Sequence, residues 1–124
     1  MKMITYFALG VILGFILVFT YLAIHSATPE ERTETLFIYG TLENPAIRFL
    51  MCRCITIAEP ATLTGYQQVG LNIEPNSDDT VLGELIKLSP EELARLDRYE
   101  EVPDNYVRKQ VTVNQALVWV YIKQ

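Results

Sequence analysis

The residues from which the organisation of the chain follows are LFIYGTL, positions 36–42. The first four are apolar or aromatic and favour a β-strand, which we expect to end at Gly40. Glu43-Asn44-Pro45 follow at once and are typical of a turn and a helix start. A strand that ends in glycine just before a helix leaves backbone N–H groups free for a carboxylate or another anion. The alternative interpretation is a buried first strand and its turn, with no ligand.

Length and composition exclude several classes of function. The 124 residues suit one domain, and 10 Lys and Arg against 15 Asp and Glu argue against a nucleic-acid partner. The single histidine, His25, lies at the edge of the apolar N-terminal segment, so no histidine is expected in a catalytic triad. Zinc needs three or four ligands, which the chain does not offer at a suitable spacing. We therefore expect no metal and no cofactor, and a catalytic group that is a carboxylate, Tyr or Lys.

Cys52 and Cys54 are two positions apart, and we expect them on a strand. A bridge between such close neighbours is strained, so the sequence predicts buried or half-buried thiols. Unpaired thiols mildly oppose export of the domain.

Residues 3–24 contain no charged side chain and are long enough to cross a bilayer as a helix. The sequence predicts a single-pass membrane anchor; a signal peptide is the rival interpretation. Lys2 precedes this segment, and Glu30, Glu31 and Glu34 follow it, which places the domain on the extracytoplasmic side. Residues 25–33 are expected to form a linker, and residues 34–124 the folded domain.

Hydrophobic alternation, turn residues and caps predict the elements of the domain. Strands are expected at 35–39, 54–58, 61–69, 80–88, 106–113 and 116–122, and helices after Asn44 and Ser89. Gly65 is expected to form a β-bulge, residues 74–79 a loop, and Asn114-Gln115 a hairpin turn. In the first helix, Ile47, Leu50 and Met51 are expected on one side.

The helix after Ser89 places Leu93, Leu96 and Glu100 on one face. Glu100 should then point towards the core, and burial would raise the pKa of its carboxyl and make it a better base. Two alternatives remain open. The helix could end earlier and leave Glu100 exposed beside Glu101, or Arg108 could pair with Glu100 and lower its pKa.

Together these segments resemble the γ-glutamylcyclotransferase-like superfamily. The matching residues are the 36–42 stretch, then Gly83-Glu84-Leu85, Leu96-Asp97-Arg98-Tyr99-Glu100, Tyr106-Val107-Arg108 and residues 116–121. The resemblance implies an α+β fold, a compact mixed β-barrel with two or so short flanking helices. It also implies that a γ-glutamyl amine or peptide cyclises to 5-oxoproline and releases its amine.

The resemblance also implies roles for particular residues. Glu100 closes the family's motif and would be the general base. Substrate would be bound by the loop residues Tyr39, Gly40, Thr41 and Leu42, together with Tyr106. The sequence thus indicates a membrane-anchored γ-glutamylcyclotransferase-like enzyme that acts on a small molecule. The alternative is an inactive binding or assembly module at the membrane, which Glu101, at a position where the family usually has glycine, favours.

Overall fold

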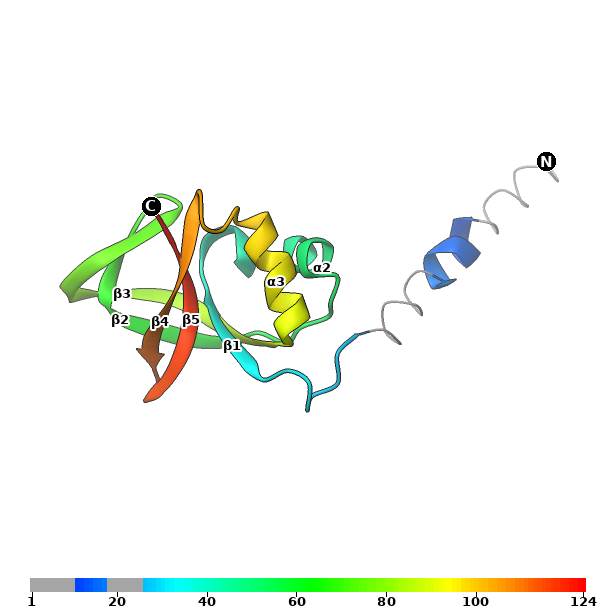
Figure 1. The fold of residues 1–124 in the computed structure, drawn as a ribbon, viewed down its shortest axis with the longest axis horizontal. Helices are drawn as coiled ribbons and strands as arrows, with labels where there is room; N and C mark the ends of the chain where they lie inside the picture. Colours follow the sequence, from blue (N-terminus) through cyan, green and yellow to red (C-terminus); the bar gives the residue numbers. More distant parts are fainter. Residues whose placement is uncertain (1–10, 18–25) are drawn as a thin grey trace.

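We describe residues 11–17 and 26–124 in a computed structural model of the chain. Figure 1 shows one mixed α+β domain, with residues 11–17 helical and outside it. In the described part of the chain the strands form a five-stranded sheet of order β2-β3-β1-β5-β4. The elements in chain order are β1 (Glu34–Ile38), the 3₁₀ helix η1 (Gly40–Glu43), α2 (Pro45–Cys52), β2 (Glu59–Val69), β3 (Asn72–Leu88), α3 (Pro90–Tyr99), β4 (Tyr106–Val113) and β5 (Ala116–Lys123).

The central strand is β1, which lies antiparallel to β3 and parallel to β5. Its residues Leu36, Phe37 and Ile38 are almost completely buried, and they alternate between two apolar clusters. Leu36 and Ile38 pack with Leu93 and Leu96 of α3, whereas Phe37 packs among the other strands. All buried core side chains in the described residues lie between Leu36 and Tyr121, so residues 26–124 contain the whole of this core.

The expected closure of the strands into a barrel is wrong for the described residues. β2 and β4 are the two ends of one hydrogen-bonded sheet and do not pair with each other. Because β2 is an edge strand, Pro60 can lie inside it without breaking a ladder hydrogen bond. The strand expected at 61–69 therefore begins earlier, at Glu59.

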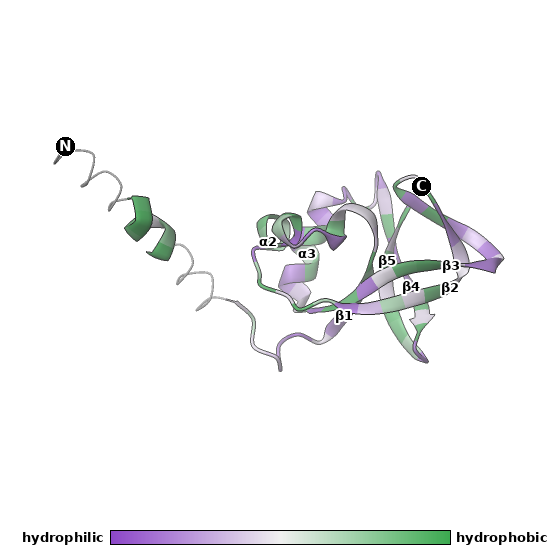
Figure 2. Ribbon diagram, turned by 180° about the vertical axis from the view of Figure 1, so that it is seen from behind, coloured by the Kyte–Doolittle hydropathy of each residue, from purple (hydrophilic) through white to green (hydrophobic). Residues whose placement is uncertain are grey.

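The expected loop at residues 74–79 is only partly correct, because the segment is part of β3 and Glu74 and Pro75 pair with β2, whereas residues 76–79 have no partner on β2 and lie opposite Gly65. Its polar side chains suit an exposed hairpin, whose outer bend has hydrophilic colours in Figure 2. The bulge predicted at Gly65 is confirmed by a shift of register between Thr64 and Tyr66. A bulge bends a strand pair, and the hairpin tip returns to the sheet, where Lys123 N–H donates to Asn72 Oδ1 at 2.8 Å.

Both predicted helices are confirmed, with their caps. Asn44 Oδ1 accepts from Ala46 N–H at 2.9 Å, and Pro45 occupies the first turn of α2. Ser89 and Glu92 form the capping box of α3. The expected inner face of α2 is only partly correct, because Leu50 is 64% exposed while Arg48 is buried. The hairpin turn at Asn114-Gln115 is confirmed, with both residues at positive φ.

The prediction of free thiols is wrong, because Cys52 and Cys54 form a disulfide. The two residues do not lie on a strand; α2 ends at Cys52, and Arg53 adopts a left-handed conformation with φ 52°. That turn brings the two cysteines to the same side, with a Cα–Cα distance of 5.2 Å. The strand expected at 54–58 does not form.

The predicted membrane anchor lies largely outside the described residues. Within residues 11–17 and 26–124, no helix is both long and apolar enough to cross a bilayer.

Candidate active site

The conformation of the loop after β1 is set by a glycine, and hydrogen bonds from a buried arginine anchor the loop. Gly40 has φ +65°, a left-handed conformation that glycine adopts without strain, and η1 starts there. The N–H groups of the first turn have no partner within the helix. Arg48 Nη1 donates to the carbonyls of Leu42 at 2.9 Å and Glu43 at 3.0 Å, which anchors the far end of the loop to α2.

Glu100 is the residue at which α3 ends. Its backbone N–H still donates to the Leu96 carbonyl at 2.9 Å, so the side chain leaves the helix on the same face as buried Leu96. The side chain is half-buried. The helix does end before Glu100, at Tyr99, as the alternative expected, but the expected exposure of Glu100 is wrong.

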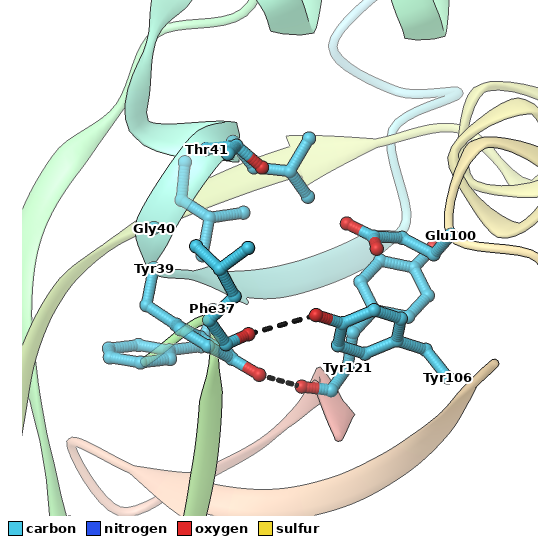
Figure 3. Close-up of a pocket in the computed structure, with 10 residues that line it drawn as sticks. Phe37, Tyr39, Gly40, Thr41, Glu100, Tyr106 and Tyr121 are labelled. Atoms are coloured by element: carbon cyan, nitrogen blue, oxygen red, sulfur yellow. Dashed lines mark hydrogen bonds between the residues drawn. The ribbon is translucent and has the colours of Figure 1, made fainter. Parts of the chain in front are cut away.

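The loop after β1 and Glu100 line the same cavity. It is about 40 Å³ in volume, room for a few water molecules, so only the reacting end of a small molecule fits inside. Figure 3 shows the Glu100 carboxylate pointing into it from the α3 side, with Gly40 and Thr41 on the opposite wall. The lining residues are Phe37, Ile38, Tyr39, Gly40, Thr41, Leu42, Leu71, Glu100, Tyr106 and Tyr121.

The electrostatics of the cavity favour a neutral Glu100. Burial raises the pKa of its carboxyl from 4.5 to about 7. No Lys, Arg or His is among the residues that line the cavity. The alternative that Arg108 neutralises Glu100 is not observed in the described residues, because Arg108 pairs with Asp97 at 3.2 Å. Glu100 can thus gain or lose a proton near neutral pH.

Three tyrosines complete the walls, and all three act as hydrogen-bond donors. Tyr39 donates to the backbone carbonyl of Tyr121, and Tyr121 donates to Asp97 Oδ1 at 2.7 Å. Tyr106 donates to the Leu71 carbonyl at 2.9 Å, which fixes the tip of the β2–β3 hairpin against the cavity. Burial, more than any neighbouring charge, raises the pKa of each of these phenols, so they stay protonated.

All of the predicted site residues therefore line one cavity: Glu100 on one side, Tyr39, Gly40, Thr41 and Leu42 on the other, and Tyr106 between them. Sequence reasoning missed Leu71, because the turn at Gly70-Leu71 was not recognised, and it missed Arg48. An arginine among the apolar residues of a short helix was a signal that could have drawn attention to Arg48. Among residues 11–17 and 26–124, no three His, Cys, Asp or Glu side chains are placed to hold a metal ion.

Glu101 lies outside the cavity and is exposed. It has φ 54°, and the hydrogen bonds Glu101 N–H to Arg98 O and Val102 N–H to Asp97 O close the helix end as a Schellman motif. The residue after the helix cap in this motif is usually glycine, because glycine tolerates the left-handed conformation. A glutamate there costs backbone energy but does not crowd the cavity.

These features define a class of small α+β proteins. Its members have a mixed sheet, a glycine loop after the first strand and a carboxylate that points into a cavity beside that loop. The family model described as "Gamma-glutamyl cyclotransferase, AIG2-like" matches residues 36–124. The chain belongs to this family, as its sequence resemblance indicated.

Solved structures agree with this fold. Two Arabidopsis thaliana proteins solved in solution are each 25% identical to this chain, with TM-scores of 0.65 and 0.62. The first of these matches covers 79% of this chain and 66% of that protein, and the second covers 73% and 68%. A structure named gamma-glutamyl cyclotransferase has 18% identity, a TM-score of 0.64 and coverage of 73% and 66%, which shows likeness of fold.

The chain spans about two thirds of the length of these proteins. No curated protein matches the chain.

Proposed function

We propose that this protein is a γ-glutamylcyclotransferase-like enzyme that converts a γ-glutamyl amine or peptide into 5-oxoproline and a free amine. The observation that carries the proposal is that Glu100 and the Gly40-Thr41 loop line the same cavity, with no cation among the lining residues. A carboxyl with a pKa of about 7 is suited to accept and return one proton near neutral pH.

The reaction needs one proton acceptor and one oxyanion site. Ionised Glu100 takes a proton from the substrate's α-ammonium group, and the amine nitrogen then forms a bond to the γ-carbonyl carbon. The carbonyl electrons move to oxygen, where loop N–H groups stabilise the negative charge. Glu100 returns this proton to the leaving nitrogen as the carbonyl re-forms and the original carbon–nitrogen bond breaks. The ionised carboxylate then takes the second proton from the new ring nitrogen and passes it to the released amine, which leaves as an ammonium ion, so that Glu100 ends ionised as it began.

Much of the rate would come from geometry. The attacking and attacked groups belong to one molecule, so holding it in a folded conformation replaces an encounter of two molecules. We assign this binding to Tyr39, Gly40, Thr41 and Leu42, with Tyr106 on the adjoining wall. Arg48 would keep the loop in place through the Leu42 carbonyl, without touching substrate. No cofactor takes part in this scheme.

The proposal includes the location of the protein. Residues 3–24 are uncharged, and we propose that they anchor the domain in a membrane as a single span. The excess of acidic residues after this segment favours an extracytoplasmic domain.

The test is to replace Glu100 by glutamine and to measure 5-oxoproline release from a panel of γ-glutamyl amines and dipeptides. Turnover should fall at least about 100-fold, the usual contribution of a general base. Glu101→Gln is the matched control, because it removes the neighbouring carboxylate outside the cavity and should keep turnover within about twofold. Equal activity of wild type and Glu100→Gln would show that Glu100 is not the base. Absence of turnover with every substrate in a folded wild-type protein would favour the inactive binding module instead.

A further inference from the structure

The place where the chain enters the domain is fixed by a buried ion pair. Arg32 lies between Glu92, at 3.1 and 3.2 Å from its two carboxylate oxygens, and Ser26 Oγ, at 2.9 Å. Glu92 is 3% exposed and also belongs to the capping box of α3. Ser26, which follows the uncharged segment almost directly, is thereby held at the start of α3.

Two depressions lie beside this entry point. The first, at the start of α3, is lined by Ala27, Ser89 and Arg95 together with the three carboxylates of Glu31, Glu91 and Glu92. Arg95 also lines the second depression, which lies between α2 and α3 and has no carboxylate in its lining. Arg53 and Arg98 line this second depression too, together with Leu50 and Tyr99. Figure 1 shows α2 and α3 side by side at one end of the domain. We call the surface formed by Leu50, Arg53, Arg95, Arg98 and Tyr99 the arginine face.

The charge of this face differs from that of the chain, whose net charge is −5. The ion pairs within the described residues are Arg32–Glu92 and Arg108–Asp97, so none of the three arginines of the arginine face belongs to one, and no carboxylate lines the depression between α2 and α3. Arg95 Nη1 donates to the Cys52 carbonyl at 2.8 Å, which holds it against the disulfide loop. Arg53 and Arg98 are exposed. The face is therefore a concentrated positive site on an acidic protein.

The uncharged residues of the arginine face, Leu50 and Tyr99, suit the interface of a bilayer. Leu50 is 64% exposed, although its neighbours in α2 pack into the core, and Tyr99 is 36% exposed. Exposed aliphatic and aromatic side chains beside arginines are typical of surfaces that lie among lipid headgroups, where rings and stems enter the interface and cations meet anionic lipids.

We propose that the arginine face lies against the anionic headgroups of the membrane that holds the N-terminal segment. The proposal rests on the membrane anchor proposed above, because the Arg32–Glu92 pair sets the entry point of that segment next to this face. In this orientation the end of α3, and with it Glu100, is next to the bilayer surface.

The test uses residues 26–124, which contain the complete core, so that the anchor cannot contribute. This fragment is sedimented with vesicles of phosphatidylcholine alone and with vesicles that also contain the anionic lipid phosphatidylglycerol. We expect binding only to the anionic vesicles, and weaker binding as salt is added. The double variant Arg53→Gln/Arg98→Gln should bind more weakly by about fivefold for each arginine removed. Arg95 is left in place because it supports the disulfide loop.

The matched control is Lys109→Gln/Lys123→Gln, which removes the same charge from exposed positions on β4 and β5. It should change binding by less than about twofold, since neither Lys109 nor Lys123 lines any of the depressions around α2, α3 and the entry point. The proposal is overturned if both double variants lose binding equally, if neutral vesicles bind as well as anionic ones, or if the fragment binds a short RNA but no vesicle.

A separate measurement distinguishes membrane binding by the N-terminal anchor from membrane binding by the arginine face. The full chain should stay with phosphatidylcholine vesicles at high salt, with or without the two arginines. Failure there would contradict the anchor, whereas loss of the lipid preference in the fragment would contradict the arginine face.

Discussion

Arg108 pairs with Asp97 and not with Glu100. Its Nη2 lies 3.2 Å from Asp97 Oδ2, and its guanidinium stacks on Trp119 at 4.3 Å from the ring centroid. Asp97 is three residues before Glu100 on α3, so the helix itself provides the partner that keeps this cation occupied. As a result, burial alone sets the pKa of Glu100, and it rises.

The first prediction concerns the pH dependence of turnover. With a carboxyl pKa of about 7, the fraction of ionised Glu100 increases through neutral pH, so kcat/KM should rise from pH 5 and level off above pH 8. The measurement is 5-oxoproline release between pH 5 and pH 9 at low substrate concentration. A profile that is already flat above about pH 5 would indicate a carboxylate of ordinary pKa.

The second prediction concerns stability and pH. The pKa of Glu100 is higher in the folded than in the unfolded chain, so the folded protein binds this proton more tightly. The associated stability is present below about pH 4.5 and is lost as the pH rises through about 7. Relative to Glu100→Gln, wild type should therefore lose roughly 1–2 kcal/mol between pH 4.5 and pH 8, allowing for solvent screening.

Urea unfolding of both proteins at several pH values measures this difference. Parallel stability curves for wild type and Glu100→Gln would contradict a raised pKa.

The third prediction concerns the helix end. Glu101 has φ 54° in a Schellman motif, so Glu101→Gly should raise the free energy of unfolding by about 1 kcal/mol. Glu101→Ala removes the same charge but keeps a Cβ, and it should give little of this gain. Thermal or urea unfolding of the two variants separates conformation from charge. Equal stability of the two would show that backbone strain at this position is not the cause.

The fourth prediction concerns the contact between β3 and β1. A Cβ at Gly83 would lie 2.6 Å from Phe37 Cζ and would collide with the Ile38 carbonyl oxygen. Gly83→Ala should thus lower the free energy of unfolding by about 1–3 kcal/mol. The neighbouring Leu82 is 75% exposed, and Leu82→Ala should change stability by less than about 0.5 kcal/mol. A neutral Gly83→Ala would mean that β1 and β3 can separate at this point without cost.

Short-range signals in the sequence predicted most of the elements. The Ser89 capping box, the Asn44-Pro45 helix start, the Asn114-Gln115 turn and the Gly65 bulge are all confirmed. Each depends on backbone hydrogen bonds or φ values within a few residues, which the local sequence controls. The resemblance to the family additionally predicted the mixed α+β fold class and the candidate site residues.

The errors have one physical origin, which is that strand pairing depends on distant partners. Glu74 and Pro75 lie in a segment with the composition of a loop but pair with β2, while residues 54–58 have the composition of a strand and join no sheet. The open sheet has the same cause, since nothing local determines whether β2 and β4 meet.

By itself, the sequence determined that the first strand ends shortly before Gly40, where both helices begin, and which face of the second helix Glu100 follows. Only the tertiary structure decided that this carboxyl shares a cavity with the Gly40 loop, that Arg108 goes to Asp97, and that Cys52 and Cys54 are joined. Local conformation follows from neighbouring residues. Proximity between distant residues follows from the order of strands in the sheet and from which side chains the packed core leaves room for.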